Sequence, residues 1–205
     1  MPQKTKVETV YMNFSEEIKD LFAELFNTGL GRAAVALNEM LRFEISLTLP
    51  VLSILSHNEF SDYIRSKASR KYVSVRQNFE GELTGTGIVT FPVISGKTLV
   101  NLLLEEDSDE GEHFNVIELD AITEVANIII NAVQNVISDM AEMEIHCLLP
   151  VPVIGNDFFS IEGLNQKNVY IVGETHFAAQ EINVQGTVIM IYSYDNIEKM
   201  VQRLL

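Results

Sequence analysis

Two sets of polar residues in this chain could act chemically on a bound molecule, and they share composition and spacing. The residues that recur at an interval of one hundred are Asp20, Glu24, Asn27 and Pro50, followed by Asp120, Glu124, Asn127 and Pro150. We call the first set site one and the second site two. A carboxylate can contact a cation, whereas a carboxamide offers both a donor and an acceptor and can hold a water molecule beside a phosphorus atom. Because the repeated residues are mostly polar, the repeat indicates a duplicated site.

Neither set contains the groups of a self-contained enzyme. The spacing offers no nucleophile beside a base, no cluster of metal ligands and no glycine-rich loop for phosphate. His146 and Cys147 are adjacent, but successive side chains on a strand point to opposite faces, which excludes a catalytic dyad there. The other histidines lack the spacing of metal ligands. We therefore expect a partner molecule to supply the reactive centre.

A helix is the element that would bring each set together. Steps of four and three residues place side chains on one helix face, and the sequence predicts helices over 15–41 and 117–141. Apolar residues follow the helical period on the other side: Leu21, Leu25, Leu30, Ala33, Ala34, Leu37 and Leu41, then Leu119, Ile122, Val125, Ala126, Ile129, Ile130, Val133, Ile137 and Met140. Gly29 and Gly31 weaken the first helix, unless another element approaches its backbone closely.

The remainder of each half is predicted to contain strands and a short helix. Strands are expected at 43–49, 71–79 and 82–93 and again at 143–149, 167–177 and 181–192, with short helices at 96–104 and 194–205. The first strand of each half is expected to end at its proline, and 56–69 is interpreted as a variable connection. Alternation of side chains from Val73 to Phe79 indicates a sheet with one buried face.

The repeated residues resemble the signature of a known family, the CheC/CheX-type phosphatases of bacterial and archaeal chemotaxis. That signature is an aspartate or serine, then a glutamate, an asparagine and a proline, and CheC-type members carry it twice. Both copies in this chain match the pattern D-x3-E-x2-N-x22-P. The segments 85–93 and 185–193 also correspond, so the resemblance covers nearly the whole chain.

The resemblance implies both a fold and an activity. The fold is α+β, in which antiparallel strands from both halves form one core with long helices outside, related by a pseudo-two-fold axis. We therefore expect one domain over 1–205, made of repeats at about 1–104 and 113–205 that the acidic linker 105–112 joins. The implied activity is hydrolysis of the aspartyl phosphate on a CheY-type receiver domain of a response regulator, in two-component signalling.

The resemblance also assigns a role to each repeated residue. The implied catalytic residues are Glu124, Asn127, Glu24 and Asn27. Each asparagine would orient the hydrolytic water, and each glutamate would contact the lysine of the receiver. Magnesium would belong to the receiver, so no cofactor or metal of the chain's own is expected. Asp20 and Asp120 are expected to cap their helices.

Other interpretations stay open beside this one. The same fold occurs in flagellar motor switch proteins, where it binds without hydrolysing, so one alternative is a non-catalytic adaptor for a phosphorylated receiver. Another is a scaffold for the CheD-type deamidase that pairs with some CheC proteins. Asparagine within a helix often only bonds to a neighbour, although two matched copies favour function. Asn131, Gln134 and Asn135 occur once and are interpreted as local packing or a solvated face.

The two sites are predicted to be unequal. In the family, small and neutral residues commonly surround the first asparagine, whereas this chain has Phe26 before Asn27 and Arg32 shortly after it. A bulky ring would obstruct docking, and a cation would oppose bound magnesium. Site two has the small Ala126 at the position that corresponds to Phe26, so we expect Asn127 to lie in the more active site.

Composition limits the other classes of function. The chain has 205 residues, 47% of them hydrophobic, which suffices to bury a sizeable core. Its formal net charge of −15 argues against a nucleic-acid partner, although basic residues gather in 65–76. The sequence shows no signal peptide or membrane-spanning stretch, and its single cysteine allows no intrachain disulfide. A cytoplasmic location is expected.

Overall fold

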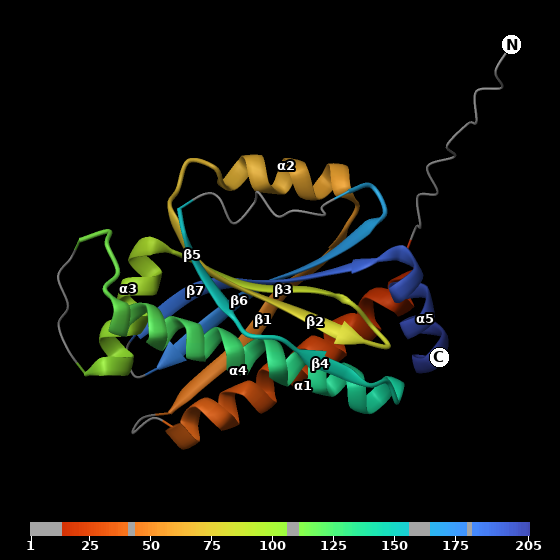
Figure 1. Cartoon of the computed structure of the whole chain (residues 1–205), viewed down its shortest axis with the longest axis horizontal. Helices are drawn as coiled ribbons and strands as arrows, with labels where there is room; N and C mark the ends of the chain where they lie inside the picture. Colours follow the sequence, from red (N-terminus) through yellow and green to blue (C-terminus); the bar gives the residue numbers. More distant parts are fainter. Residues whose placement is uncertain (1–13, 41–43, 106–110, 156–164, 180–181) are drawn as a thin grey trace, which may run out of the picture.

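In the described part of the chain, an antiparallel sheet of seven strands contains strands from both halves (Figure 1). The computed structural model describes residues 14–40, 44–105, 111–155, 165–179 and 182–205. The strands are β1 (Ile45–Leu55), β2 (Tyr72–Gly81), β3 (Gly85–Pro92), β4 (Ile145–Cys147), β5 (Val151–Ile154), β6 (Asn168–Ala179) and β7 (Ile182–Ser193). Their order in the sheet is β1-β6-β7-β3-β2-β4, and β5 also pairs with β2.

The first strand of each half pairs with a hairpin of the other half. β1 pairs with β6, while β4 and β5 both pair with β2. The two pairings correspond, because Leu47 lies opposite Phe177 and Cys147, one hundred residues after Leu47, lies opposite Phe79, although the two phenylalanines are 98 residues apart. Each half therefore depends on the other half to complete its own side of the sheet.

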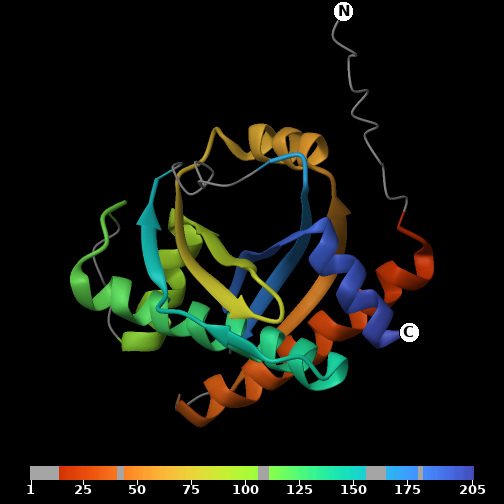
Figure 2. The same cartoon turned by 45° about the vertical axis from the view of Figure 1, so that its right-hand side comes forward.

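Helices cover the two faces of this sheet unequally. They are α1 (Glu16–Met40), α2 (His57–Lys67), α3 (Val93–Leu104), α4 (Val116–Ala141) and α5 (Tyr194–Leu204). The main core lies between one face of the sheet and α1, α3, α4 and α5. A smaller core lies on the other face, beneath α2 (Figure 2). The predicted α+β class, with an antiparallel sheet and long helices outside, is confirmed.

Helices α1 and α4 pack directly against each other. A Cβ atom added to Gly29 would lie 2.7 Å from Cα of Val133, whereas one added to Gly31 would meet nothing within 4 Å. Gly29 is therefore the position at which a second element approaches the backbone of α1. A further link is the ion pair between Arg32 on α1 and Asp139 on α4, with an N to O distance of 2.7 Å.

A capping box fixes the start of α4. The side chain of Asn115 accepts from the N–H of Glu118, and the Glu118 carboxylate accepts from the N–H of Asn115. The same carboxylate pairs at 2.8 Å with Lys97 of α3, and both side chains are almost completely buried. Asp120 and Asp20 lie inside their helices, so the predicted capping role for these two residues is wrong.

The two repeated prolines interrupt strand pairing in different ways. β1 continues past Pro50 to Leu55, so the predicted end of this strand at the proline is wrong. The register with β6 shifts between Thr48 and Val51, and a residue without an N–H is tolerated in such an irregularity. In the second half the strand does end, because Pro150 lies between β4 and β5.

Helix α2 occupies much of the predicted connection 56–69. Ser56 caps it and forms a capping box with Glu59, which is the sequence signal that our reasoning missed. Residues 41–43 and 106–110, which hold parts of the first predicted helix and strand and of the acidic linker, lie outside the described residues. Of the helices within the described ranges, none is both long and apolar enough to cross a membrane.

Candidate functional site

Site one is a set of exposed polar side chains on α1. Asp20, Glu24 and Asn27 are all exposed to solvent. Phe22 and Leu25, between them in the sequence, point into the core and are completely buried. Within the described ranges, no residue forms a side-chain hydrogen bond or ion pair with these three polar side chains. Both the carboxylate and the carboxamide of site one are therefore available to a partner.

Site two differs from site one at its asparagine. Asp120 and Glu124 are exposed on α4, but Asn127 is partly buried. Its Oδ1 atom accepts from Nε2 of Gln77 at 3.0 Å and from Nδ2 of Asn131 at 2.7 Å. A carbonyl oxygen has two lone pairs, so these two bonds leave it no capacity for a third donor.

Two backbone carbonyls fix the orientation of this amide network. Nε2 of Gln77 also donates to the carbonyl of Leu148 at 2.8 Å, and Nδ2 of Asn131 also donates to the carbonyl of Asn127 at 2.7 Å. Because a carbonyl only accepts, Gln77 and Asn131 must direct N–H groups here, and Asn127 must turn its oxygen toward them. Leu148 lies in the interruption between β4 and β5, which also contains Pro150, and its carbonyl accepts the hydrogen bond from Gln77 there.

By strand register, the counterpart of Gln77 in the other half of the sheet is a threonine. Thr175 of β6 lies two residues before Phe177, which pairs with Leu47. Gln77 of β2 lies two residues before Phe79, which pairs with Cys147. Oγ1 of Thr175 and Oε1 of Gln77 are both buried, and neither has a hydrogen-bond partner among the described residues. The shorter threonine side chain does not engage Asn27, which remains exposed.

The structure shows the surroundings of the two residues that were expected to impair site one. Phe26 is completely buried, so its ring belongs to the core and cannot block docking on the exposed face. The guanidinium of Arg32 is engaged by the carboxylate of Asp139, which offsets its charge. The expected obstruction by Phe26 is therefore wrong, whereas the expected effect of Arg32 and the ranking of the two sites stay predictions.

The three polar residues that occur only in the second helix have separate roles. Gln134 is buried and donates from Nε2 to the hydroxyl of Tyr192 at 3.2 Å, whereas Asn135 is exposed. Local packing and a solvated face, as expected, account for these two residues. Asn131 bonds to Asn127, four residues earlier, and the spacing of four residues already placed both side chains on one helix face.

Other chemically capable groups are not arranged for catalysis. Burial raises the pKa of the Cys147 thiol to about 11, so the thiol is protonated and weakly nucleophilic at neutral pH. The neighbouring His146 is exposed and pairs with Glu144 at 3.1 Å. In the part of the chain that the structure describes, no three histidine, cysteine, aspartate or glutamate residues are grouped as metal ligands.

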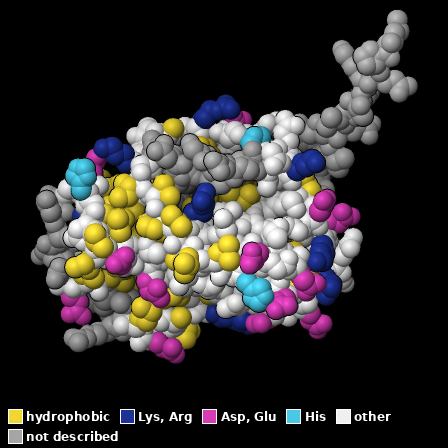
Figure 3. All heavy atoms as spheres, viewed as in Figure 1, with side chains coloured by type: hydrophobic (Ala, Val, Ile, Leu, Met, Phe, Trp, Pro, Cys, Tyr) yellow, Lys and Arg dark blue, Asp and Glu magenta, His cyan; other side chains and the backbone are white. Residues whose placement is uncertain are grey.

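Exposed apolar side chains lie on the elements that carry site two. Val116 and Ile117 are exposed in the first turn of α4, and Leu149 beside β5 is 87% exposed. Figure 3 shows hydrophobic side chains gathered over β5 and the beginning of α4. Such a patch beside a polar site is typical of a surface that binds another protein.

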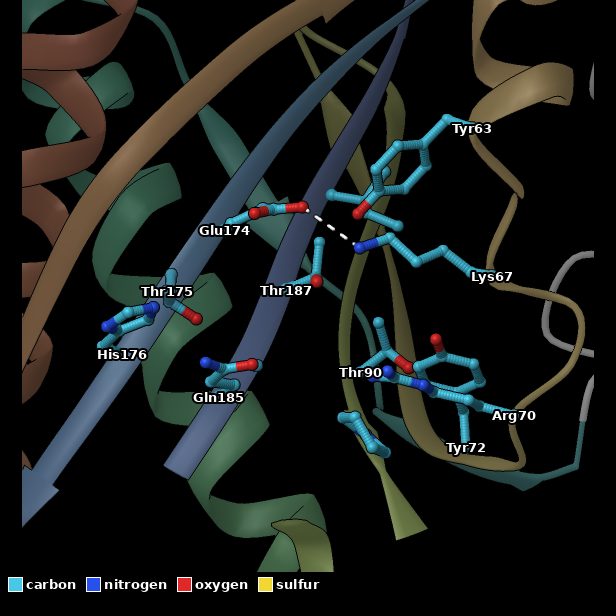
Figure 4. A pocket seen from close by; sticks show the side chains of 13 residues that line it. Tyr63, Lys67, Arg70, Tyr72, Thr90, Glu174, Thr175, His176, Gln185 and Thr187 are labelled. Atoms are coloured by element: carbon cyan, nitrogen blue, oxygen red, sulfur yellow. Dashed lines mark hydrogen bonds and ion pairs between the residues drawn. The ribbon is translucent and has the colours of Figure 1, made fainter. Parts of the chain in front are cut away.

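A pocket on the opposite face of the sheet lies beneath α2 (Figure 4). Its volume is about 110 Å³, and the residues that line it include Tyr63, Lys67, Arg70, Tyr72, Glu174 and Thr187. Part of the basic segment 65–76 therefore lines this pocket, where Lys67 pairs with Glu174 at 3.2 Å. None of the repeated motif residues lines this pocket, although Thr175, the counterpart of Gln77, does.

Comparison with known proteins extends the similarity along the chain. No protein-family model matches it. The CheY-P phosphatase CheC of Bacillus subtilis is 22% identical over 203 residues, which cover 94% of this chain and 96% of CheC.

Two solved structures share the fold. FliY from Thermotoga maritima has a TM-score of 0.76 at 20% identity, over 94% of this chain and 98% of FliY. The chemotaxis protein CheX from Desulfovibrio desulfuricans has a TM-score of 0.53 at 18% identity, over 83% of this chain and 97% of CheX. The similarity to CheC along nearly the whole chain, together with these two folds, confirms the predicted resemblance to the CheC/CheX-type family.

Proposed function

We propose that this chain hydrolyses the aspartyl phosphate of a CheY-type receiver domain. The observation that carries the proposal is the exposure of Glu24 and Asn27 on one face of α1, repeated on α4 by Glu124 beside Asn127. Similarity to the CheY-P phosphatase CheC supports the choice of substrate. The chain offers polar groups on a rigid helix, which suits the positioning of a water molecule more than it suits nucleophilic attack.

The chemistry at site one follows from the capacity of the Asn27 amide. Its Oδ1 can accept a hydrogen bond from the attacking water, so that a lone pair of this water points toward the phosphorus. As the new P–O bond forms, the bond from phosphorus to the aspartate oxygen breaks, the carboxylate leaves, and the proton of the water goes to the phosphate. Glu24 lies three residues earlier on the same face of α1, where its carboxylate can bind the lysine of the receiver. Magnesium and the phosphorylated aspartate would both come from the receiver.

A second candidate function is a non-catalytic adaptor that binds the phosphorylated receiver. The observation that favours it is the engagement of the Asn127 oxygen by Gln77 and Asn131, because a saturated oxygen cannot accept from water. The exposed apolar residues near site two would serve docking in either case. Association with a CheD-type deamidase stays a prediction from the resemblance.

The test is the decay rate of a phosphorylated receiver with and without this chain. We expect the wild-type chain to accelerate decay and the double variant Asn27→Ala/Asn127→Ala to lose about a hundredfold of the added rate, because the water loses its positioning group. Asn135→Ala is the matched control, since Asn135 is an exposed asparagine on α4 outside the motif.

The adaptor gives a different result in the same assay. It would bind a receiver that beryllofluoride has activated, yet leave the decay rate of the phosphorylated receiver unchanged. This result from the wild-type chain would overturn the phosphatase proposal.

A further inference from the structure

Sites one and two share a motif but differ in whether the asparagine oxygen is free. Asn27 is exposed, whereas Oδ1 of Asn127 accepts from both Gln77 and Asn131. The difference originates outside the motif, at two positions. By strand register, Thr175 corresponds to Gln77. On the helix, Gly31 corresponds to Asn131, so site one lacks both amide donors.

We propose that Gln77 is a positioning residue that latches site two, so that site one performs the hydrolysis while Asn127 cannot orient water until its bond to Gln77 opens. This inference rests on the proposed phosphatase function. In the latched arrangement Asn127 directs its Nδ2 group away from the network, and an N–H group cannot accept a hydrogen bond from water. Site two still presents Glu124 for docking, because that carboxylate is exposed.

The environment of Gln77 favours this role over one in stability. Its side chain is 2% exposed, and its Oε1 atom has no hydrogen-bond partner among the described residues. A buried acceptor without a partner destabilises the fold, and turning the amide would bring that oxygen against the carbonyl of Leu148. An apolar side chain of similar size would avoid this cost. The glutamine is therefore explained by the hydrogen bonds that its Nε2 group donates.

The position of Leu148 suggests how the latch opens. Its carbonyl holds the Gln77 amide, while its side chain is 43% exposed beside the apolar residues near site two. A receiver that docks on this surface contacts the segment on which the Gln77 bond depends. Release of Asn127 then requires the loss of one neutral hydrogen bond from Gln77, which typically shifts an equilibrium by about tenfold.

The first experiment isolates site two in an Asn27→Ala background and adds Gln77→Thr, the residue found at the corresponding position. We expect Asn27→Ala alone to remove most of the activity, and Gln77→Thr to restore kcat by about tenfold at an unchanged half-saturating receiver concentration. A gain in kcat is not a result that structural damage produces. Gln202→Thr, at an exposed glutamine on α5, is the matched control and should change nothing.

The second experiment examines the latch without using activity. Side-chain amide protons of Gln77 should exchange with solvent far more slowly than those of Gln202 in the wild-type chain, measured by NMR. Equal exchange rates would contradict the latch. The latch would be overturned if the wild-type chain is active, Asn27→Ala retains most of that activity, and the added Gln77→Thr brings no gain. The phosphatase proposal would still stand in that case. A wild-type chain that never accelerates decay would instead overturn the phosphatase proposal.

Discussion

Asn27 and Asn127 occupy the same place in the same motif, yet they differ in what they can still bind. The amide of Asn27 is exposed, while Oδ1 of Asn127 already accepts two hydrogen bonds. Glu24 and Glu124 do not differ in this way, because both carboxylates are exposed. In the proposed reaction, both sites can therefore dock a receiver through their glutamates, whereas only site one has an asparagine oxygen free to orient water.

Substitutions within site one should separate these two steps. Glu24→Ala removes a docking contact, so we expect a higher half-saturating receiver concentration and a maximal rate that recovers when receiver is added in excess. Asn27→Ala should lower the maximal rate at every receiver concentration. Decay of the phosphorylated receiver over a concentration series measures both, with Glu39→Ala, an exposed residue of α1 outside the motif, as the control. Full recovery of the Asn27 variant at high receiver concentration would contradict the assigned roles.

Cys147 offers a pH-dependent test of burial near site two. Burial raises the pKa of its thiol from 9.0 to about 11, so the folded state holds the proton over a range in which the unfolded state releases it. This contribution to stability is complete below pH 9 and is lost as the pH rises toward 11. At pH 9 we expect iodoacetamide to alkylate this single cysteine about fifty-fold more slowly in the folded chain than in urea. Mass spectrometry would measure this, and equal rates would show that the thiol is exposed.

At the scale of elements, the packing of α1 on α4 can be tested with two glycines of α1. Gly29 lies at the contact with α4, and Gly31 lies outside it. Gly29→Ala would place a Cβ atom 2.7 Å from the Val133 backbone, which should destabilise the fold by about 1 to 3 kcal/mol. Gly31→Ala meets open space and should stabilise α1 by up to about 1 kcal/mol. Urea unfolding of both variants gives the two free energies. A stabilising Gly29→Ala would mean that the helices are further apart than described here.

The elements that follow a strong local pattern were predicted well from the sequence. The two long helices were expected at 15–41 and 117–141, and they occur as α1 and α4, because an apolar stripe with the helical period sets their position. Met140 is an exception in this stripe, since it is 48% exposed near the end of α4. The boundary of β1 was wrong because a register shift, which depends on its partner strand, accommodates Pro50.

The same distinction between local and distant information applies to the candidate site. Identical spacing indicated which helix faces would carry the Glu and Asn side chains, and Glu24, Asn27 and Glu124 are exposed on them. The restraint on Asn127 could not be predicted, because Gln77 lies fifty residues away in the sequence and acts only through the pairing of β2 with β4 and β5. Phe26 was misjudged for a related reason, because its direction depends on how α1 packs on the sheet.

At the scale of the whole molecule, the order of strands makes the two halves interdependent. β1 of the first half lies beside β6, and β4 and β5 of the second half lie beside β2. One main core includes buried residues from the helices of both halves. This arrangement contrasts with two folded units joined by a linker, in which each sheet would be complete within its own half.

Interleaved halves should unfold together, which is also the test of the predicted single domain over 1–205. Leu25→Ala in α1 and Ile130→Ala in α4 each remove a fully buried side chain, at a cost of about 2 to 5 kcal/mol. Because the sheet and the main core are shared, we expect each variant to shift one common urea transition to a lower midpoint, with the same curve from circular dichroism and from hydrogen exchange in either half. If the halves were independent, the curve would have two steps, and each substitution would move only the step of its own half.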